Sequence, residues 1–353
     1  CKNIQRMPKE VDNSSPDWQN IGPYGSLTDR NSVFTGRVLD VNVGTSGKVM
    51  VGAASGGLWE VDNSQTTHLS SMLNSSVASS FDVQPGDPSI ILLGTGEDYV
   101  RGGTGLYRTV NGGLNWTAIS MGASTPQHFH LIRYSPLIPT LVHAGTSMGY
   151  FRSNDGGLSW TQVLPNNAVT DIAFHPTDPN VIYLGRWDNG NGLGGLYKSL
   201  DAGATWTRQT SGDIPTSNVG KTLISISAQH PDNMYCLMSK DNTDVLYGIY
   251  KTTNAGSNWI NVSPPSDILD GLGWYLGALG VCPTDPNICL AGGIWLWRTS
   301  NGGQNWSEIN YFNDINAKIH VDFHSIIWEN SGNSVWIGHD GGISNSTDNG
   351  VTY

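Results

Sequence analysis

A ten-residue pattern recurs along the chain and constrains its fold more than any other feature. The segment "FRSNDGGLSW" (151 to 160) returns as "YRTVNGGLNW", "YKSLDAGATW", "YKTTNAGSNW" and "WRTSNGGQNW", in units of 44 to 53 residues. Each copy has a Ser or Thr, an Asn or Asp two positions later, a Gly two further on and a closing Trp. Seven units can be aligned, and only the first, "EVDNSQTTH", is degraded. A repeat of this period decides the architecture before other features do.

The chemistry of the pattern predicts a tight hairpin turn. A short hydroxyl or carboxylate side chain accepts backbone N–H bonds within its own turn, and Gly supplies a positive φ. The aromatic residue then starts the next strand and packs the turn down. The remainder of each unit, such as "VTDIAFHPTDPNVIYLG" (169 to 185), reads as strand, turn and strand. Each unit therefore predicts one four-stranded blade, and the chain predicts an all-β, seven-bladed β-propeller.

These copies resemble Asp-box (BNR) repeats. In their families the repeats occupy the hairpin between the third and fourth strands of a propeller blade, which agrees with the prediction from the turn. The resemblance covers nearly the whole chain and is specific for fold. It says little of function, because sialidases, sortilin-type receptors, two-propeller xyloglucan hydrolases and photosystem assembly factors all carry such repeats.

The two ends of the chain predict how the ring closes. "DWQNIG" (17 to 22) resembles the strand after each repeat, and the seventh unit stops at Tyr353, where its own fourth strand is due. We therefore expect residues 17 to 23, Trp18 included, to supply the outermost strand of the seventh blade and remove both sheet edges. The expected organisation is a flexible segment 1–16 and one propeller 17–353, within a longer natural chain.

Composition limits the partners and the location. The net charge of -11, with only 18 Lys and Arg, argues against nucleic acid. Acidic ligands are disfavoured too, unless a local Arg pocket overrides the overall field. No apolar run is long enough to span a membrane. Cys1 followed by a polar stretch suits a lipid-anchored mature protein, which predicts an extracellular or cell-surface location.

Two cysteines flank a turn in the sixth unit. Cys282 and Cys289 enclose "PTDPNI", so they are placed to face each other across a hairpin and form a disulfide. Two buried thiols are an equally good interpretation.

The ligand site is expected on the face opposite the repeated turns, where loops line the central funnel. One position there is Gly in six units and Trp295 in the sixth blade, so Trp295 is expected to project into the funnel, either as a ligand platform or as a plug. Trp187 and Trp274 lie in neighbouring loops of the same face.

A group of His and Asp residues marks the seventh blade. In "HVDFH", His320, Asp322 and His324 share a face if the segment is a strand, and "GHDGG" adds His339 and Asp340 in the adjacent loop. His130 is at the position equivalent to His324. The group suits a divalent metal ion or a His–Asp proton relay, and bracing of the blade by hydrogen bonds is the alternative.

The loop "GTGEDYVRGG" brings Glu97, Asp98 and Arg101 to the same face. Its carboxylates could serve as glycosidase acid and base or bind polyol hydroxyls, and an ion pair with Arg101 is the alternative. Candidate catalytic residues are Glu97, Asp98 and Asp340. Candidate ligand contacts are Trp295, Trp187, Trp274, Arg101 and His130.

The segments "WQNIGP", "GRV", "GAASGGLWE", "GTGE", "HVDFH" and "GHDGG" resemble large secreted bacterial proteins described as sortilin-like or glycosyl-hydrolase-like. The xyloglucan hydrolases of that resemblance carry a catalytic Asp where this chain has Ser55, and their second carboxylate comes from a second propeller. The sialidase Arg-Ile-Pro motif is absent. The resemblance therefore favours a non-catalytic propeller that binds glycan or protein, with a carbohydrate-active hydrolase or lyase as the alternative.

Overall fold

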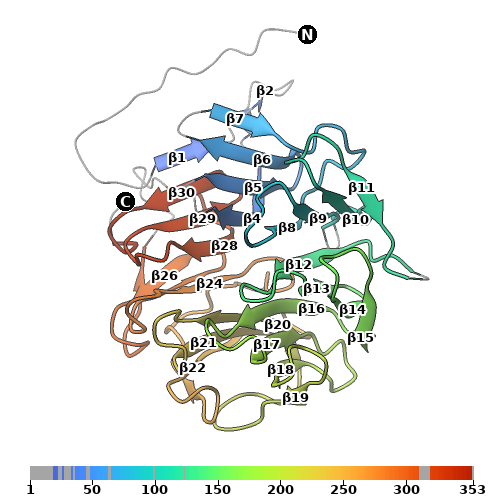
Figure 1. Ribbon diagram of the computed structural model, residues 1–353. Coiled ribbons are helices and arrows are strands. Elements are labelled where there is room, and N and C mark those ends of the chain that lie inside the picture. The colour runs from blue at the N-terminus through green and yellow to red at the C-terminus, as the bar shows by residue number, and fades with distance from the viewer. Residues whose placement is uncertain are drawn as a thin grey trace.

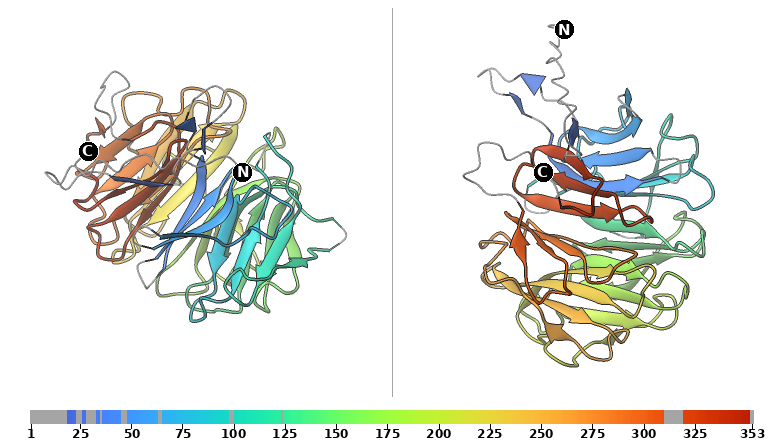
Figure 2. Two further views of the ribbon diagram at one scale, coloured as in Figure 1. Left: turned by 90° about the horizontal axis from the view of Figure 1, so that it is seen from above. Right: turned by 90° about the vertical axis from the view of Figure 1, so that its left-hand side faces the viewer.

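The protein is a seven-bladed β-propeller. The computed structural model describes residues 19–22, 26–27, 33–34, 36–44, 48–62, 65–97, 100–122, 124–309 and 319–351. These residues form seven four-stranded antiparallel sheets and one two-stranded sheet, β2 (Ser26–Leu27) with β3 (Val33–Phe34). The four-stranded sheets stand as blades around a common axis, as Figures 1 and 2 show. None of the described segments is a helix long and apolar enough to cross a membrane.

Four strands that follow one another in the chain make each of the first six blades. Blade 1 is β4 (Val38–Val43), β5 (Val49–Ala53), β6 (Gly57–Asp62) and β7 (Gln65–His68), and blade 2 is β8 (Ser80–Val83), β9 (Ile91–Gly94), β10 (Leu106–Thr109) and β11 (Thr117–Ile119). Blade 3 is β12 (Phe129–Tyr134), β13 (Val142–Thr146), β14 (Gly149–Ser153) and β15 (Thr161–Pro165), and blade 4 is β16 (Val169–Phe174), β17 (Ile182–Arg186), β18 (Gly195–Ser199) and β19 (Thr207–Arg208). Blade 5 is β20 (Val219–Ile226), β21 (Met234–Lys240), β22 (Leu246–Thr252) and β23 (Ile260–Asn261), and blade 6 is β24 (Ala278–Val281), β25 (Cys289–Gly292), β26 (Leu296–Thr299) and β27 (Ser307–Glu308).

The seventh blade takes one strand from the other end of the chain. It consists of β28 (Phe323–Trp328), β29 (Val335–His339), β30 (Gly342–Ser346) and β1 (Gln19–Gly22). Gln19 pairs with Asn345 in the antiparallel register of β1 and β30, and Figure 1 shows the blue strand beside the red one. The predicted closure of the ring is therefore confirmed, although Trp18 lies outside the described residues.

The repeated sequence forms the turn between the third and fourth strands of a blade, here called the repeat turn. In blade 3 the Ser153 hydroxyl accepts the Gly157 N–H at 2.9 Å and donates to Asp155 Oδ1 at 2.7 Å. The same carboxylate oxygen accepts the Ser159 N–H at 2.9 Å, and Gly157 has a φ of 86°. The hydroxyl, the carboxylate and the glycine thus have the roles that the sequence predicts.

A basic side chain in the third strand joins each of several blades to the next one. Lys198 Nζ donates to the Ala255 carbonyl at 3.0 Å, and Arg108, Arg152 and Arg298 donate in the same way from their Nε atoms. The accepting carbonyl belongs in every case to the residue after the Asn or Asp of the neighbouring repeat turn. These inter-blade hydrogen bonds pair a cation with a buried or half-buried carbonyl, which makes them stronger than neutral ones.

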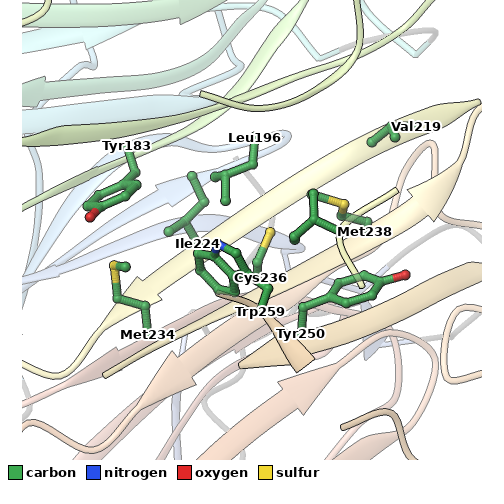
Figure 3. Close-up of a cluster of buried hydrophobic side chains, with 10 residues drawn as sticks. Tyr183, Leu196, Val219, Ile224, Met234, Cys236, Met238, Tyr250 and Trp259 are labelled. Carbon is green, nitrogen blue, oxygen red and sulfur yellow. The ribbon is translucent and has the colours of Figure 1, made fainter. Parts of the chain in front are cut away.

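Apolar side chains fill the space between adjacent blades. Figure 3 shows the cluster between blades 4 and 5, in which Tyr183 and Leu196 of one blade face Met234, Cys236 and Tyr250 of the next. Packed sheets lie about 10 Å apart, and side chains fill that space. These side-chain layers between the blades make most of the core.

Close approach of the blades also depends on a glycine in several second strands. A Cβ on Gly94 would lie 2.5 Å from the Cβ of Phe129 in blade 3. A Cβ on Gly338 would lie 2.7 Å from the Val38 side chain of blade 1. Neither contact is possible for real atoms, so a larger residue would push the innermost strands apart.

The expected disulfide is wrong. Cys282 and Cys289 are buried free thiols. The strand register places Cys289 opposite Val281, one residue short of Cys282, and a one-residue offset turns side chains to opposite faces of a sheet. The Cys282 thiol contacts Gly332 of blade 7, whereas Cys289 packs in the cluster that contains Tyr235 of blade 5.

Candidate functional site

The first strands of the seven blades line a central channel. Neighbouring first strands contact one another around the ring, from β4 and β8 to β28 and β4. At the end of the channel opposite the repeat turns lies a cavity of about 320 Å³. Its chemistry-bearing lining residues at this end include Glu97, His128, His130, Lys221, Trp274, Tyr275 and His324, and the cavity continues along the channel past Asp40, Arg133 and Asp171. We call this end of the channel the mouth.

β-Bulges direct two histidines into this cavity. In blade 3, Phe129 and Leu131 pair with consecutive residues of the next strand, which leaves His130 as the extra residue. In blade 7 the same irregularity leaves His324 between Phe323 and Ser325. A bulge re-aims the side chain of its extra residue. The predicted equivalence of His130 and His324 is confirmed, and both line the cavity.

An ion-pair network at the mouth joins three adjacent blades, from blade 2 through blade 1 to blade 7. Arg37 Nη2 donates to both carboxylate oxygens of Glu97 at 2.7 Å. The Nε atom of the same guanidinium lies 4.0 Å from Asp340 Oδ1, and that oxygen lies 2.7 Å from His324 Nε2. Glu97 is only 6% exposed, and Arg37 is its ion-pair partner. The pairing leaves neither oxygen of Glu97 without a protein partner.

Tyr275 lies in contact with this network. The Arg37 guanidinium is 5.3 Å from the centre of the Tyr275 ring, and the centres of the Tyr275 and His324 rings lie 5.0 Å apart in an edge-to-face arrangement. Lys221 Nζ donates to the Tyr275 carbonyl at 2.9 Å and so fixes the segment that carries Trp274 and Tyr275. The two aromatic rings lie 5.1 Å apart. They give the mouth an apolar surface beside its charges.

Burial sets the protonation of the polar side chains here. It lowers the pKa of His324, although the hydrogen bond and charge of Asp340 raise it in part. A neutral His324 donates its Nε2–H to Asp340 and keeps Nδ1 as an acceptor. Burial also raises the pKa of the Tyr275 hydroxyl, and Asp340 raises it further. At neutral pH both rings are therefore uncharged.

Further along the channel, Arg133 binds Asp40 with two hydrogen bonds of 3.0 Å. Burial raises the pKa of Asp82 and of Asp171 to about 6, and the charge of Arg133 opposes that change. Asp171 accepts the Ile224 N–H at 2.7 Å. These side chains hold the first strands of blades 1 to 5 together, which is a structural role.

The expected His and Asp group at blade 7 is only partly assembled. His320 and Asp322 do not share a strand face with His324, because β28 begins at Phe323 and Asp322 has a φ of 69°. His339 is buried, bonds Ser344 Oγ through Nε2 at 2.8 Å, and has a pKa lowered to about 3 by burial. Within the described ranges no three His, Cys, Asp or Glu side chains are placed to hold a metal ion.

The three tryptophans lie in different places. Trp274 lines the channel cavity. Trp295 packs against the apolar cluster that includes Ile268 and Leu269, and it is not among the described lining residues of the cavity. Trp187 lines a second pocket of about 530 Å³ beside the mouth, and its indole N–H donates to Asp241. Arg101 and His128 line the same pocket.

The acidic loop divides its side chains between the two cavities. Glu97 and Arg101 face each other as a backbone bridge, but they form no side-chain ion pair with each other. Glu97 turns to Arg37, whereas Arg101 Nη1 donates to Ser55 Oγ of blade 1 at 3.0 Å. The alternative of a Glu97–Arg101 ion pair is therefore wrong. Asp98 lies outside the described residues.

Arg37 and Tyr275 were not singled out by sequence reasoning. Arg37 belongs to "GRV", which leads into the first strand of its blade, as "HFH" and "HVDFH" do in blades 3 and 7. Alignment of those segments would have placed Arg37 at the mouth. Tyr275 follows Trp274 in a loop whose conformation the sequence does not define.

Comparison with known proteins gives relatives in fold. No family model matches the chain. A xyloglucanase of Paenibacillus sp. is 23% identical over an alignment of 210 residues, and the match covers 48% of this chain and 20% of that protein. The GH74 xyloglucanase from Xanthomonas campestris has a similar structure, with a TM-score of 0.69 and 19% identity over 94% of this chain and 53% of that one.

A second kind of relative is the extracellular domain of a putative one-component system from B. thetaiotaomicron. Its TM-score is 0.65, at 15% identity over 94% of this chain and 40% of that one. This chain thus spans about half the length of the solved xyloglucanase and a fifth of the curated one. At these identities the structures establish the shared propeller fold.

Proposed function

We propose that this propeller binds a polysaccharide at the mouth of its channel and does not cleave it. One observation carries the proposal: Trp274 and Tyr275 line the channel cavity beside polar groups whose carboxylates are already paired with Arg37 and His324. Sugar rings present an apolar face to aromatic side chains and hydroxyls to polar ones, so this combination suits a glycan.

The pairing of the carboxylates argues against hydrolysis. A glycosidase needs one carboxyl group as acid and another as base or nucleophile, both in reach of the scissile bond. Here both Glu97 oxygens accept from Arg37, and Asp340 accepts from His324. Of the other carboxylates that line the cavity, Asp40 accepts from Arg133, and Asp171 accepts the backbone N–H groups of Ile172 and Ile224. Ser55 stands where the resembling hydrolases carry a catalytic Asp, and its hydroxyl accepts from Arg101.

Binding and cleavage are separated by one set of measurements. We expect wild-type protein to be retarded in gels that contain its polysaccharide, and Trp274→Ala to lose about tenfold or more in affinity, because an aromatic contact is lost. Leu158→Ala, an exposed change on the repeat turn of blade 3, serves as the control. The proposal is contradicted if all three proteins are retarded equally, and also if none of them is retarded.

A carbohydrate-active hydrolase is the second candidate, favoured by the sequence similarity to a xyloglucanase. A hydrolase would release reducing sugar from xyloglucan, and the Glu97→Gln and Asp340→Asn variants would lose that activity.

The proposal includes an extracellular or cell-surface location, supported by the similarity to an extracellular domain.

A further inference from the structure

The described lining of the second pocket at the mouth contains a cation and no acid. Its described lining comprises Val100, Arg101, Gly102, His128, Ser147, Asn166, Ala168, Trp187 and Asn189, from loops of blades 2, 3 and 4. None of these residues is a carboxylate, although the chain contains 29 Asp and Glu against 18 Lys and Arg. Its volume of about 530 Å³ is that of a small-ligand site.

Arg101 is the charged group of this pocket, and most of its donors are open. Its Nη1 atom donates to Ser55 Oγ at 3.0 Å and lies 3.5 Å from the Ala54 carbonyl. Within the described part of the chain, no carboxylate pairs with the guanidinium, and Nε and Nη2 make no hydrogen bond. A guanidinium with one anchored nitrogen and two open ones is arranged to bind a carboxylate.

The pocket also has an aromatic wall with a fixed orientation. The indole N–H of Trp187 donates to Asp241 in the loop after β21, which holds the ring in place. Asn166, Asn189 and Ser147 supply amide and hydroxyl groups around it. An apolar ring, neutral hydrogen-bonding groups and one open cation match a sugar unit that bears a carboxylate.

The two cavities of the mouth are adjacent. His128 lines both of them. The backbone bridge between Glu97 and Arg101 places one of these residues at each cavity. A chain-like ligand that occupies the channel cavity therefore reaches the second pocket with its next units.

We propose that the second pocket binds a uronate unit, with its carboxylate on Arg101 and its ring against Trp187, so that the ligand of the propeller is an acidic polysaccharide. This inference rests on the proposed function. The overall negative charge does not oppose it, because exposed charges beyond about 8 Å are screened at physiological ionic strength, whereas Arg101 makes direct contact.

The test uses uronate-containing oligosaccharides of four to six units, each paired with its carboxyl-reduced, neutral counterpart. Calorimetric titration of the whole chain should show at least tenfold tighter binding of the acidic member. Arg101→Gln should remove that preference by weakening the acidic member at least tenfold more than the neutral one, whereas Arg101→Lys should keep part of it. Lys48→Gln, which removes one positive charge far from the pocket in blade 1, is the matched control.

The outcomes separate this inference from the proposed function. If wild-type protein binds both members equally, or if Arg101→Gln weakens both equally, the uronate site is wrong while polysaccharide binding stands. If neither member nor any other polysaccharide binds, both proposals fail. If Lys48→Gln matches Arg101→Gln, the preference reflects net charge and the pocket assignment is overturned. Because Arg101 is exposed, thermal unfolding of its variants should match wild type.

Discussion

Arg152 donates from its Nε atom to the carbonyl of Ala202 at 2.9 Å, across the interface between blades 3 and 4. The bond joins the third strand of one blade to the repeat turn of the next. Arg152→Met keeps the aliphatic packing and removes the donor, so we expect a loss of about 1.5 kcal/mol in the free energy of unfolding. Urea unfolding gives this value.

In blade 1 the equivalent residue is Glu60, which pairs with Lys48 of the same blade. Lys48→Met should therefore unfold at the same urea concentration as wild type, because an exposed ion pair contributes little; an equal loss in both variants contradicts the inter-blade role.

Two repeat turns hold an alanine in a left-handed conformation. Ala202 and Ala255 have φ values of 57° and 53°, where the other complete turns have Gly or Asn. Replacement by Gly relieves the contact of Cβ with the backbone, so Ala202→Gly and Ala255→Gly should each stabilise the protein by about 1 kcal/mol. Thermal unfolding checks this. Ala204→Gly, in the same turn but at an ordinary φ, is the control and should be neutral or slightly destabilising.

The carboxylate of a repeat turn should make stability depend on acid pH. Hydrogen bonds from the Thr205 hydroxyl and backbone N–H lower the pKa of Asp201 to about 2, from 3.8. Because the pKa of Asp201 is lower in the folded than in the unfolded protein, its charged carboxylate stabilises the fold at pH values above the unfolded pKa. That contribution is lost as the pH falls from about 4 to about 2. The effect should be below about 1 kcal/mol, because the carboxylate is exposed.

Asp201→Asn isolates this contribution. Asn occupies the same position in three other turns, where Asn111 Oδ1 accepts the Asn115 N–H at 2.9 Å, so the turn should survive the change. Unfolding midpoints of the two proteins should converge as the pH falls from 5 to 2. A difference that does not change with pH would show that the charge contributes nothing.

The described cysteines should be reduced and inaccessible. Cys236, Cys282 and Cys289 are all buried, and burial raises the pKa of the Cys289 and Cys236 thiols, which lowers their reactivity. We expect a thiol reagent to modify none of the three in the native protein and all of them in denaturant. Peptide mapping after labelling assigns each site. A Cys282–Cys289 cross-link in the mapped peptides would overturn the assignment.

Removal of the closing strand should open the ring. Deletion of residues 1–23 takes β1 from the edge of β30, which then has unpaired backbone groups. We expect the melting temperature to fall by roughly 5 °C or more and the protein to self-associate. Deletion of residues 1–16 leaves β1 in the chain and serves as the control. Identical melting and elution of both shortened proteins would mean that β1 contributes little to closure.

The fold was predictable because each repeat encodes one blade locally. The hydroxyl, the carboxylate and the glycine define the turn, and the period fixes the number of blades. The site was less predictable, because it depends on departures from regular strands. The bulge at His324 and the positive φ at Asp322 separate side chains that an unbroken strand would align. The Arg37–Glu97 pair joins different blades, so no local pattern announces it.

The pairing of Gln19 with Asn345 has a consequence for how the chain folds. Contacts between residues so far apart in sequence carry a large loop-closure cost and form late. During synthesis the first strand emerges before any of its blade, and it stays unpaired until β30 has left the ribosome. The six preceding blades are each complete from consecutive segments, so they assemble as the chain lengthens. We therefore expect the final blade to form last, and until it forms, the nascent protein has an open sheet edge.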